Sequence, residues 1–150
     1  MEQAHRFVYA SMPSRGLMYV LQAWPTIHAC MYAGGLNASL HVYYGFTQYD
    51  EQRAASDDEY RAWMADMRTA LGRASALGVH YMGMRSHSEL ARALAKSAFY
   101  LYPTIYPETS CIALMQAYTF SGNSFVTFFF EVSYHSQFIT KTKYNIYLYI

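Results

Sequence analysis

The fold is decided by the stretch Val79–Tyr102, VHYMGMRSHSELARALAKSAFYLY. Its opening run, Val79–Met84, is mostly apolar and predicts a strand. Ser86-x-x-Glu89 follows as a capping box, in which each side chain bonds the other residue's backbone N–H, so a helix is expected to begin here. The apolar residues on one inward face of that helix are Leu90, Ala93 and Leu94. Ala98–Tyr102 predicts the next strand, so the stretch is a strand–helix–strand unit.

Two further strands precede this unit. The runs RFVYAS at Arg6–Ser11 and SLHVYYGF at Ser39–Phe46 are rich in β-branched and aromatic residues and predict strands. Between them, apolar residues recur at helical spacing from Leu17 to Trp24. Pro25 is expected to interrupt or end that helix, because proline removes a backbone donor and clashes with the preceding turn.

A second capping box, Ser56-x-x-Glu59, predicts a helix before the third strand. Its apolar residues fall on one stripe: Tyr60, Trp63, Met64, Met67 and Leu71. After the fourth strand, Pro103 is expected to end the pairing, and Thr109 or Ser110 is expected to cap a last helix that runs to Ala117.

Strands and helices thus alternate, which predicts the α/β class: a Rossmann-like parallel sheet with helices on both faces. In such a sheet, ligands bind beyond the carboxyl ends of the strands. The loops at that edge are Ser11–Arg15, Met84–His87 and Tyr102–Ser110. This domain is expected to span residues 1–117. The Tyr- and Phe-rich tail, residues 118–150, has β-prone runs at Phe125–Val132 and Tyr144–Ile150, and we interpret it as an edge strand or a disordered end.

The composition excludes several classes of protein. The chain has 150 residues and a net charge of +1, which suits one globular domain and indicates no bulk attraction to nucleic acid. It has neither an apolar leader nor a run long enough to cross a membrane, and Cys30 and Cys111 are expected to be reduced thiols, so we expect a cytoplasmic location. The six histidines show no spacing typical of a metal site.

Four residues at the expected ligand edge are candidates for chemistry. Arg15 could neutralise a phosphate with bidentate geometry, and Arg85 could do so from the loop Met84–His87; solvated loop arginines are the alternative. Glu108 precedes the last helix and could accept hydrogen bonds from ligand hydroxyls, or it could only cap that helix. Cys111 lies on the first turn of that helix, but no neighbouring base is identifiable, so a structural thiol is the better interpretation.

Together, four segments of the first 117 residues resemble the C-terminal domain of the GT-B retaining glycosyltransferases (family 4, glycosyl transferases group 1). The segments are FVYASMPSRGL at 7–17, LHVYYG at 40–45, GVHYMG at 78–83 with SEL at 88–90, and YPT at 102–104 with PETSC at 107–111. They occur in the order and at the spacing typical of that family.

The resemblance implies a role for each matching residue. Arg15 and Gly16 would bind the donor diphosphate; a further basic residue of the family falls at Ala10, so Arg15 carries more of the charge. Glu108 would hold the donor-sugar hydroxyls, and with Arg15 it is the candidate for catalysis. The strand and turn around Tyr81–Arg85, with Met84 and Arg85, would contact the base, largely through backbone. The backbone of Thr109, Ser110, Cys111 and Ile112 would cradle the phosphates. Gln116 replaces the glutamate that binds the ribose in the family.

The implied activity is the transfer of a hexosyl-type sugar from a nucleoside-diphosphate sugar to an acceptor, with retention and without a metal. The acceptor site would come from an N-terminal GT-B domain outside this chain, and the acceptor itself could be a glycan, a lipid or a protein. One alternative is a non-catalytic nucleotide-sugar-binding or interaction module derived from such an enzyme. Another is an unrelated flavodoxin-like binding domain. The change in composition after Ala117 would fit a frameshift, a mispredicted exon or a truncation.

Overall fold

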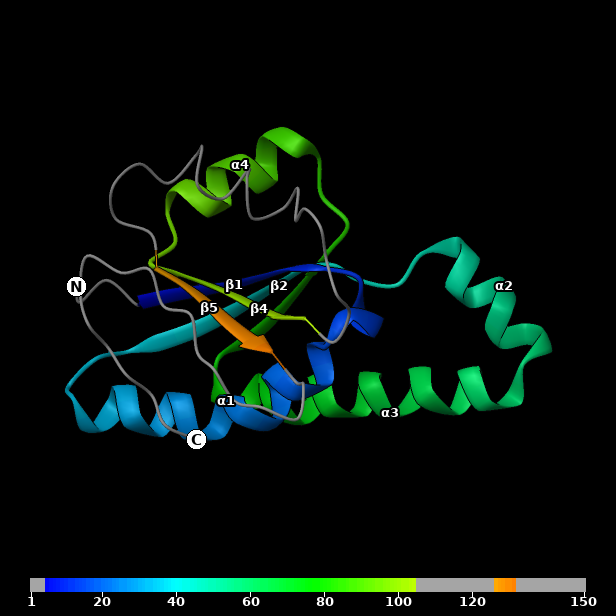
Figure 1. The fold of residues 1–150 in the computed structure, drawn as a ribbon, viewed down its shortest axis with the longest axis horizontal. Helices are drawn as coiled ribbons and strands as arrows, with labels where there is room; N and C mark the ends of the chain where they lie inside the picture. Colours follow the sequence, from blue (N-terminus) through cyan, green and yellow to red (C-terminus); the bar gives the residue numbers. More distant parts are fainter. Residues whose placement is uncertain (1–4, 105–125, 132–150) are drawn as a thin grey trace.

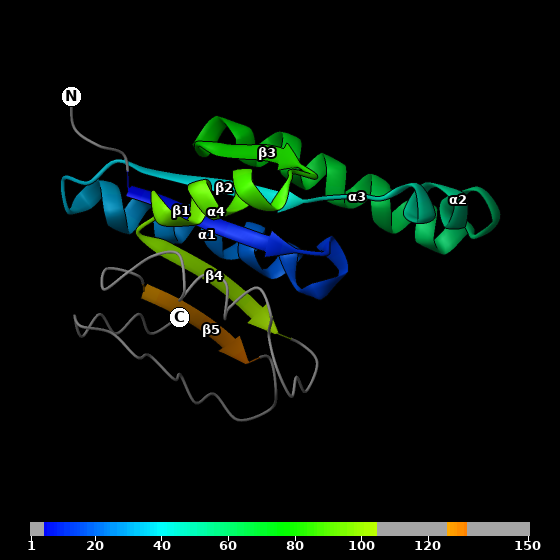
Figure 2. The same ribbon diagram turned by 90° about the horizontal axis from the view of Figure 1, so that it is seen from above.

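The computed structural model describes residues 5–104 and 126–131. The strands of this described part form one parallel sheet in the order β3-β2-β1-β4-β5. They are β1 (His5–Ser11), β2 (Ala38–Tyr44), β3 (Val79–Gly83), β4 (Phe99–Thr104) and β5 (Val126–Glu131). Figure 2 shows them side by side in this order. The predicted α/β class with a Rossmann-like parallel sheet is confirmed.

Helices cover both faces of the sheet, as predicted. They are α1 (Leu17–Ala33), α2 (Gln48–Ser56), α3 (Asp58–Ala74) and α4 (His87–Ala95), with short 3-10 helices η1 (Pro13–Arg15) and η2 (Ser75–Leu77). Figure 1 shows α1 and α3 beneath the sheet, α4 above it and α2 beyond its end. The connections from β1 to β2 and from β2 to β3 therefore use one face, and the return from β3 to β4 uses the other.

Side chains along each strand point alternately to the two faces of the sheet and form a core on each face. In β1, Phe7 and Tyr9 point into the core between the sheet and the helices α1 and α3. Val8 and Ala10 point into the core between the sheet and α4. All four are buried, because a central parallel strand is covered on both sides. The predicted inward face of α4 is also confirmed, since Ala93 and Leu94 are buried and Leu90 packs against them.

The helix α1 continues past Pro25 to Ala33, so the expectation that proline would interrupt or end it was wrong. Pro25 lies on the exposed side of the helix. On the inward side, Trp24 and Ile27 are buried on either side of the proline, and the Trp24 indole N–H donates to the Leu77 carbonyl at 2.9 Å. Packing of this apolar face outweighs the local cost of proline, which is about 3 kcal/mol.

One of the two predicted capping boxes is present and the other is wrong. At α4, the Ser86 hydroxyl accepts from the Glu89 N–H and the Glu89 carboxylate accepts from the Ser86 N–H, as predicted. Ser56 instead ends α2, and α3 is capped by the Asp57 carboxylate, which accepts from the Tyr60 N–H at 2.9 Å. A carboxylate one residue further along was the stronger cap. The stripe behind it is confirmed, with Met64, Met67 and Leu71 buried.

The strand β4 runs through Pro103 to Thr104, so the expected end at Pro103 was also wrong. Its ladder with β1 covers only Phe99 and Tyr100, whereas Pro103 pairs in register with Phe130 of β5 on the other side. A proline that lacks a partner on one side removes little from the sheet. The strand β5 lies within the aromatic tail and pairs in parallel with β4.

Candidate functional site

The sheet order places the topological switch point between β1 and β4, at the carboxyl edge of the sheet. The chain builds outward from β1 through β2 to β3 and then returns across the sheet to β4 on the other side of β1. Open α/β sheets bind their ligands at a switch point of this kind. Of the three predicted loops, the structure describes the first two and the beginning of the third.

The loop after β1 is held in a defined conformation. The Tyr9 hydroxyl donates to the Met12 carbonyl at 2.7 Å, and the Arg15 N–H donates to the same carbonyl at 2.9 Å. Burial raises the pKa of Tyr9, and the Arg15 charge opposes that rise, so the phenol stays protonated and keeps donating. The loop therefore presents Arg15 on an exposed, fixed turn at the carboxyl edge.

Gly16, at the end of this loop, packs against β4. It has φ of +98° and packs so closely on the end of β4 that a Cβ atom would lie 2.5 Å from the Pro103 carbonyl oxygen. Both conditions require glycine. The predicted site residues Arg15 and Gly16 are thus brought directly beside the point where the chain leaves β4.

The N-terminus of α1 differs from those of the other described helices. The side chains of Thr47, Asp57 and Ser86 cap α2, α3 and α4, whereas no side chain caps α1, whose N-cap residue is Gly16. Uncapped backbone N–H groups at the positive end of a helix dipole suit an anion. At the candidate site, α1 therefore lacks the side-chain cap that occupies the N-terminus of α4.

A small pocket of about 40 Å³ lies at the same edge, on the α4 side. The predicted residues Met84 and Arg85 line it, and both are exposed. It is also lined by Ala10, the position where the resembled enzymes have a basic residue. Three further lining residues were not predicted as site residues: Tyr43, Tyr44 and Leu90. The structure therefore brings Met84 and Arg85 together with the end of β1.

Backbone strain marks this pocket as well. Tyr44 has φ of +81°, and it is the one residue other than glycine with positive φ in the described part of the chain. Gly45 follows with φ of +81°, so β2 ends at Tyr44 and not at Phe46 as predicted. Strain of this kind is found preferentially at functional sites. The signal that could have found this end was Gly45, which was predicted to lie within the strand, and nothing in the sequence indicated that Tyr44 would share its conformation.

Charge near the pocket is predominantly positive. Burial raises the pKa of Tyr43, while Arg6 and Arg85 lower it and Glu89 raises it. The Glu89 carboxylate is engaged by the Ser86 hydroxyl and N–H, which lowers its own pKa. The Glu89 carboxylate therefore serves the cap of α4.

Six predicted site residues lie outside the described residues: Glu108, Thr109, Ser110, Cys111, Ile112 and Gln116. Their placement against Arg15 and Gly16 stays a prediction. Within residues 5–104 and 126–131, no three His, Cys, Asp or Glu side chains gather closely enough to hold a metal ion. Over the same ranges, none of the helices is both long and apolar enough to span a membrane.

No known protein family matches the chain, and none of the curated proteins is significantly similar to it.

Proposed function

We propose that this chain binds a nucleoside-diphosphate sugar at the carboxyl edge of its sheet, as the donor-binding half of a retaining glycosyltransferase. The observation that carries the proposal is the contact of Gly16 with Pro103. It sets Arg15 and the uncapped start of α1 beside the end of β4, from which the chain leads within a few residues to Glu108.

The proposed division of labour follows from the chemistry of the donor. A diphosphate carries negative charge that grows as the sugar departs, and a preorganised guanidinium with helix N–H groups stabilises that charge. Arg15 and the first turn of α1 would take this part. Glu108 would accept hydrogen bonds from the sugar hydroxyls. The exposed pair Met84 and Arg85, beside Ala10, would contact the nucleotide.

Binding is tested by thermal unfolding of the full 150-residue chain with UDP-glucose or GDP-mannose. A ligand that binds only the folded state raises the unfolding temperature, with about 2.7 kcal/mol of stabilisation at one hundred times its Kd. We expect one of the donors to give such a shift, and Arg15→Ala and Glu108→Ala to reduce it.

The matched control is Arg73→Ala. Arg73 is an exposed arginine in the last turn of α3, just before η2 and the start of β3, so it lies at the opposite edge of the sheet. Its replacement removes the same charge and should leave the shift unchanged. An equal loss in Arg73→Ala would indicate a general charge effect, and no shift with any nucleotide sugar would overturn the proposal.

Catalysis is a separate question from binding, since the implied acceptor site belongs to another domain. We expect the isolated chain to transfer little or no sugar even when it binds the donor. Sugar transfer measured with the purified chain would contradict that expectation. The alternative, a non-catalytic nucleotide-sugar-binding module, predicts donor binding that no added GT-B N-terminal domain converts into transfer.

A further inference from the structure

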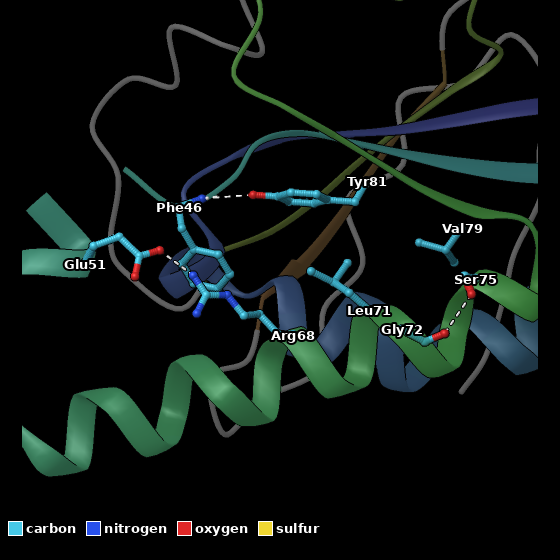
Figure 3. Close-up of a pocket in the computed structure, with 8 residues that line it drawn as sticks. All are labelled: Phe46, Glu51, Arg68, Leu71, Gly72, Ser75, Val79 and Tyr81. Carbon is cyan, nitrogen blue, oxygen red and sulfur yellow. Dashed lines mark hydrogen bonds and ion pairs between the residues drawn. The ribbon is translucent and has the colours of Figure 1, made fainter. Parts of the chain in front are cut away.

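A second, larger cavity lies on the opposite side of β3 from the candidate donor site. It encloses about 400 Å³ between α3, the edge strand β3 and the loop that follows β2. Figure 3 shows its lining residues converging from these elements. Small-molecule pockets enclose roughly 300–1,000 Å³, so this cavity has the size of a site and not of a packing defect.

Two aromatic rings form one wall. The Tyr81 ring is 47% exposed, yet its hydroxyl oxygen accepts a hydrogen bond from the Phe46 N–H at 3.1 Å (Figure 3). Gly45 makes this arrangement possible, because a Cβ atom there would lie 2.0 Å from the Tyr81 hydroxyl oxygen. The ring is therefore fixed as a wall, and its hydroxyl proton remains available to donate.

The rest of the lining is apolar or electrically balanced. Leu71 and Val79 are buried and form the floor. At one end the Arg68 guanidinium pairs with the Glu51 carboxylate and lies 5.1 Å from the centre of the Phe46 ring. The charged groups of the cavity thus neutralise each other, so an ion entering it would lose hydration without gaining an unpaired counter-charge.

The Ser75 hydroxyl, at the start of η2 directly after α3, also lines this space. The Ser75 hydroxyl donates to the Gly72 carbonyl at 2.7 Å, which leaves its oxygen free to accept from a ligand. Beside it, Gly72 lies inside α3 with nothing within 4 Å of where its Cβ would be. The wall is therefore open at Gly72, and the cavity offers flat apolar surface with an acceptor on one side.

We propose that this cavity binds a small, flat, uncharged aromatic molecule with an N–H or O–H group, of the indole or phenol class. The Phe46 and Tyr81 rings would contact the ligand ring, where aromatic pairs gain energy beyond the area they bury. The ligand donor would bond the Ser75 hydroxyl oxygen. The site is independent of the proposed donor site, because β3 separates them.

The test is a titration of the ¹⁵N-labelled full chain with indole, followed through the backbone amide signals by NMR. We expect saturable shifts centred on Phe46, Gly72 and Tyr81. Gly72→Leu would place a side chain in the cavity, where it would take up space that the ligand needs. We expect the Kd for indole to rise about tenfold or more, which corresponds to a loss of about 1.4 kcal/mol of binding free energy. Because leucine is a better helix former than glycine, this variant should stay folded.

Two controls distinguish the occupation of the cavity by the leucine side chain from a general change in the structure of α3. Gly72→Ala adds only a methyl group and should keep most of the affinity. 1-Methylindole lacks the N–H, so it should bind the natural chain more weakly than indole does, and Ser75→Ala should remove that difference.

Four results would overturn the proposal. Three come from the titrations: shifts that do not saturate, equal affinity in Gly72→Leu, or UDP-glucose shifts at the same amides, which would make the cavity part of the donor site. A dimer in size-exclusion chromatography whose formation broadens the β3 amides would also overturn it, since the occupant would be a second copy at the free strand edge. None of these results depends on Arg15, so the two proposals fail separately.

Discussion

The backbone of Gly16, at the start of α1, lies directly against the carbonyl of Pro103 in β4. No Cβ atom fits between them, because the distance to the carbonyl oxygen would be 2.5 Å. The two residues are 87 positions apart, and their contact fixes the start of α1 against the end of β4.

Replacement of Gly16 tests this contact. Gly16→Ala should destabilise the chain more than Gly35→Ala, because both glycines have positive φ but only Gly16 has a neighbour within 4 Å. The excess should be about 1–3 kcal/mol, the usual cost of forcing extra volume into a packed site. Urea unfolding of both variants measures it. Equal losses would mean that strain alone, and not the approach to Pro103, requires glycine.

The histidine pair on β2 and β3 predicts a pH dependence. His41 and His80 are register partners with ring centroids 4.9 Å apart, and burial, the Arg6 charge and His80 lower the pKa of His41 from 6.5 to about 4. Between pH 6.5 and 4, the unfolded chain binds this proton more readily than the folded one, so stability falls as the pH falls through that window.

His41→Gln should flatten this dependence, because the glutamine does not titrate. His87→Gln, at an exposed histidine at the start of α4, serves as the control and should leave the slope unchanged. Thermal unfolding from pH 4 to 7 gives the comparison. A slope in His41→Gln that matches the natural chain would contradict the assignment.

Asp50 predicts a further loss of stability in more acidic solution. Burial would raise its pKa, but hydrogen bonds from Thr47 and the Tyr60 hydroxyl, the latter at 2.5 Å, together lower it below 3.8. The stabilisation is therefore present above pH 3.8 and is lost as the pH falls through the lower, folded-state pKa.

Tyr60→Phe removes one of these donors and should cost about 1–3 kcal/mol near neutral pH. It should also shift the acid transition to higher pH, whereas Tyr49→Phe, at an exposed tyrosine of α2, should not. Circular dichroism during acid titration measures both. An unchanged transition in Tyr60→Phe would show that Thr47 alone determines the pKa.

The two predicted capping boxes allow a direct comparison. Ser86→Ala should cost about 1 kcal/mol, because it removes the acceptor for the Glu89 N–H at the start of α4. Ser56→Ala should cost under about 0.5 kcal/mol, the usual limit for a surface substitution, because Asp57 caps α3. Denaturant unfolding of both variants checks this, and similar losses would contradict the assigned caps.

Part of the candidate site was predictable from sequence. Arg15, Gly16, Met84 and Arg85 follow strand ends, and strand ends of a parallel sheet share one edge, so local pattern placed them there. Tyr43, Tyr44 and Leu90 could not be found in this way. They join the small pocket through packing between β2 and α4, which no short stretch of sequence encodes.

The sequence by itself determined the α/β class, the order of the first four strands and the inward faces of the predicted helices, because side-chain periodicity and the cap of α4 are local properties. It did not predict α2, which the structure places between β2 and α3. The tertiary structure decided where the elements end. Burial of Trp24 and Ile27 carries α1 past Pro25, and the lack of a β1 partner lets β4 include Pro103. It also decided that Val79–Gly83 forms the sheet edge and that α4 returns the chain to β4 beside β1. These outcomes depend on contacts between residues far apart in the chain, whose energies exceed the local preferences that a sequence pattern records.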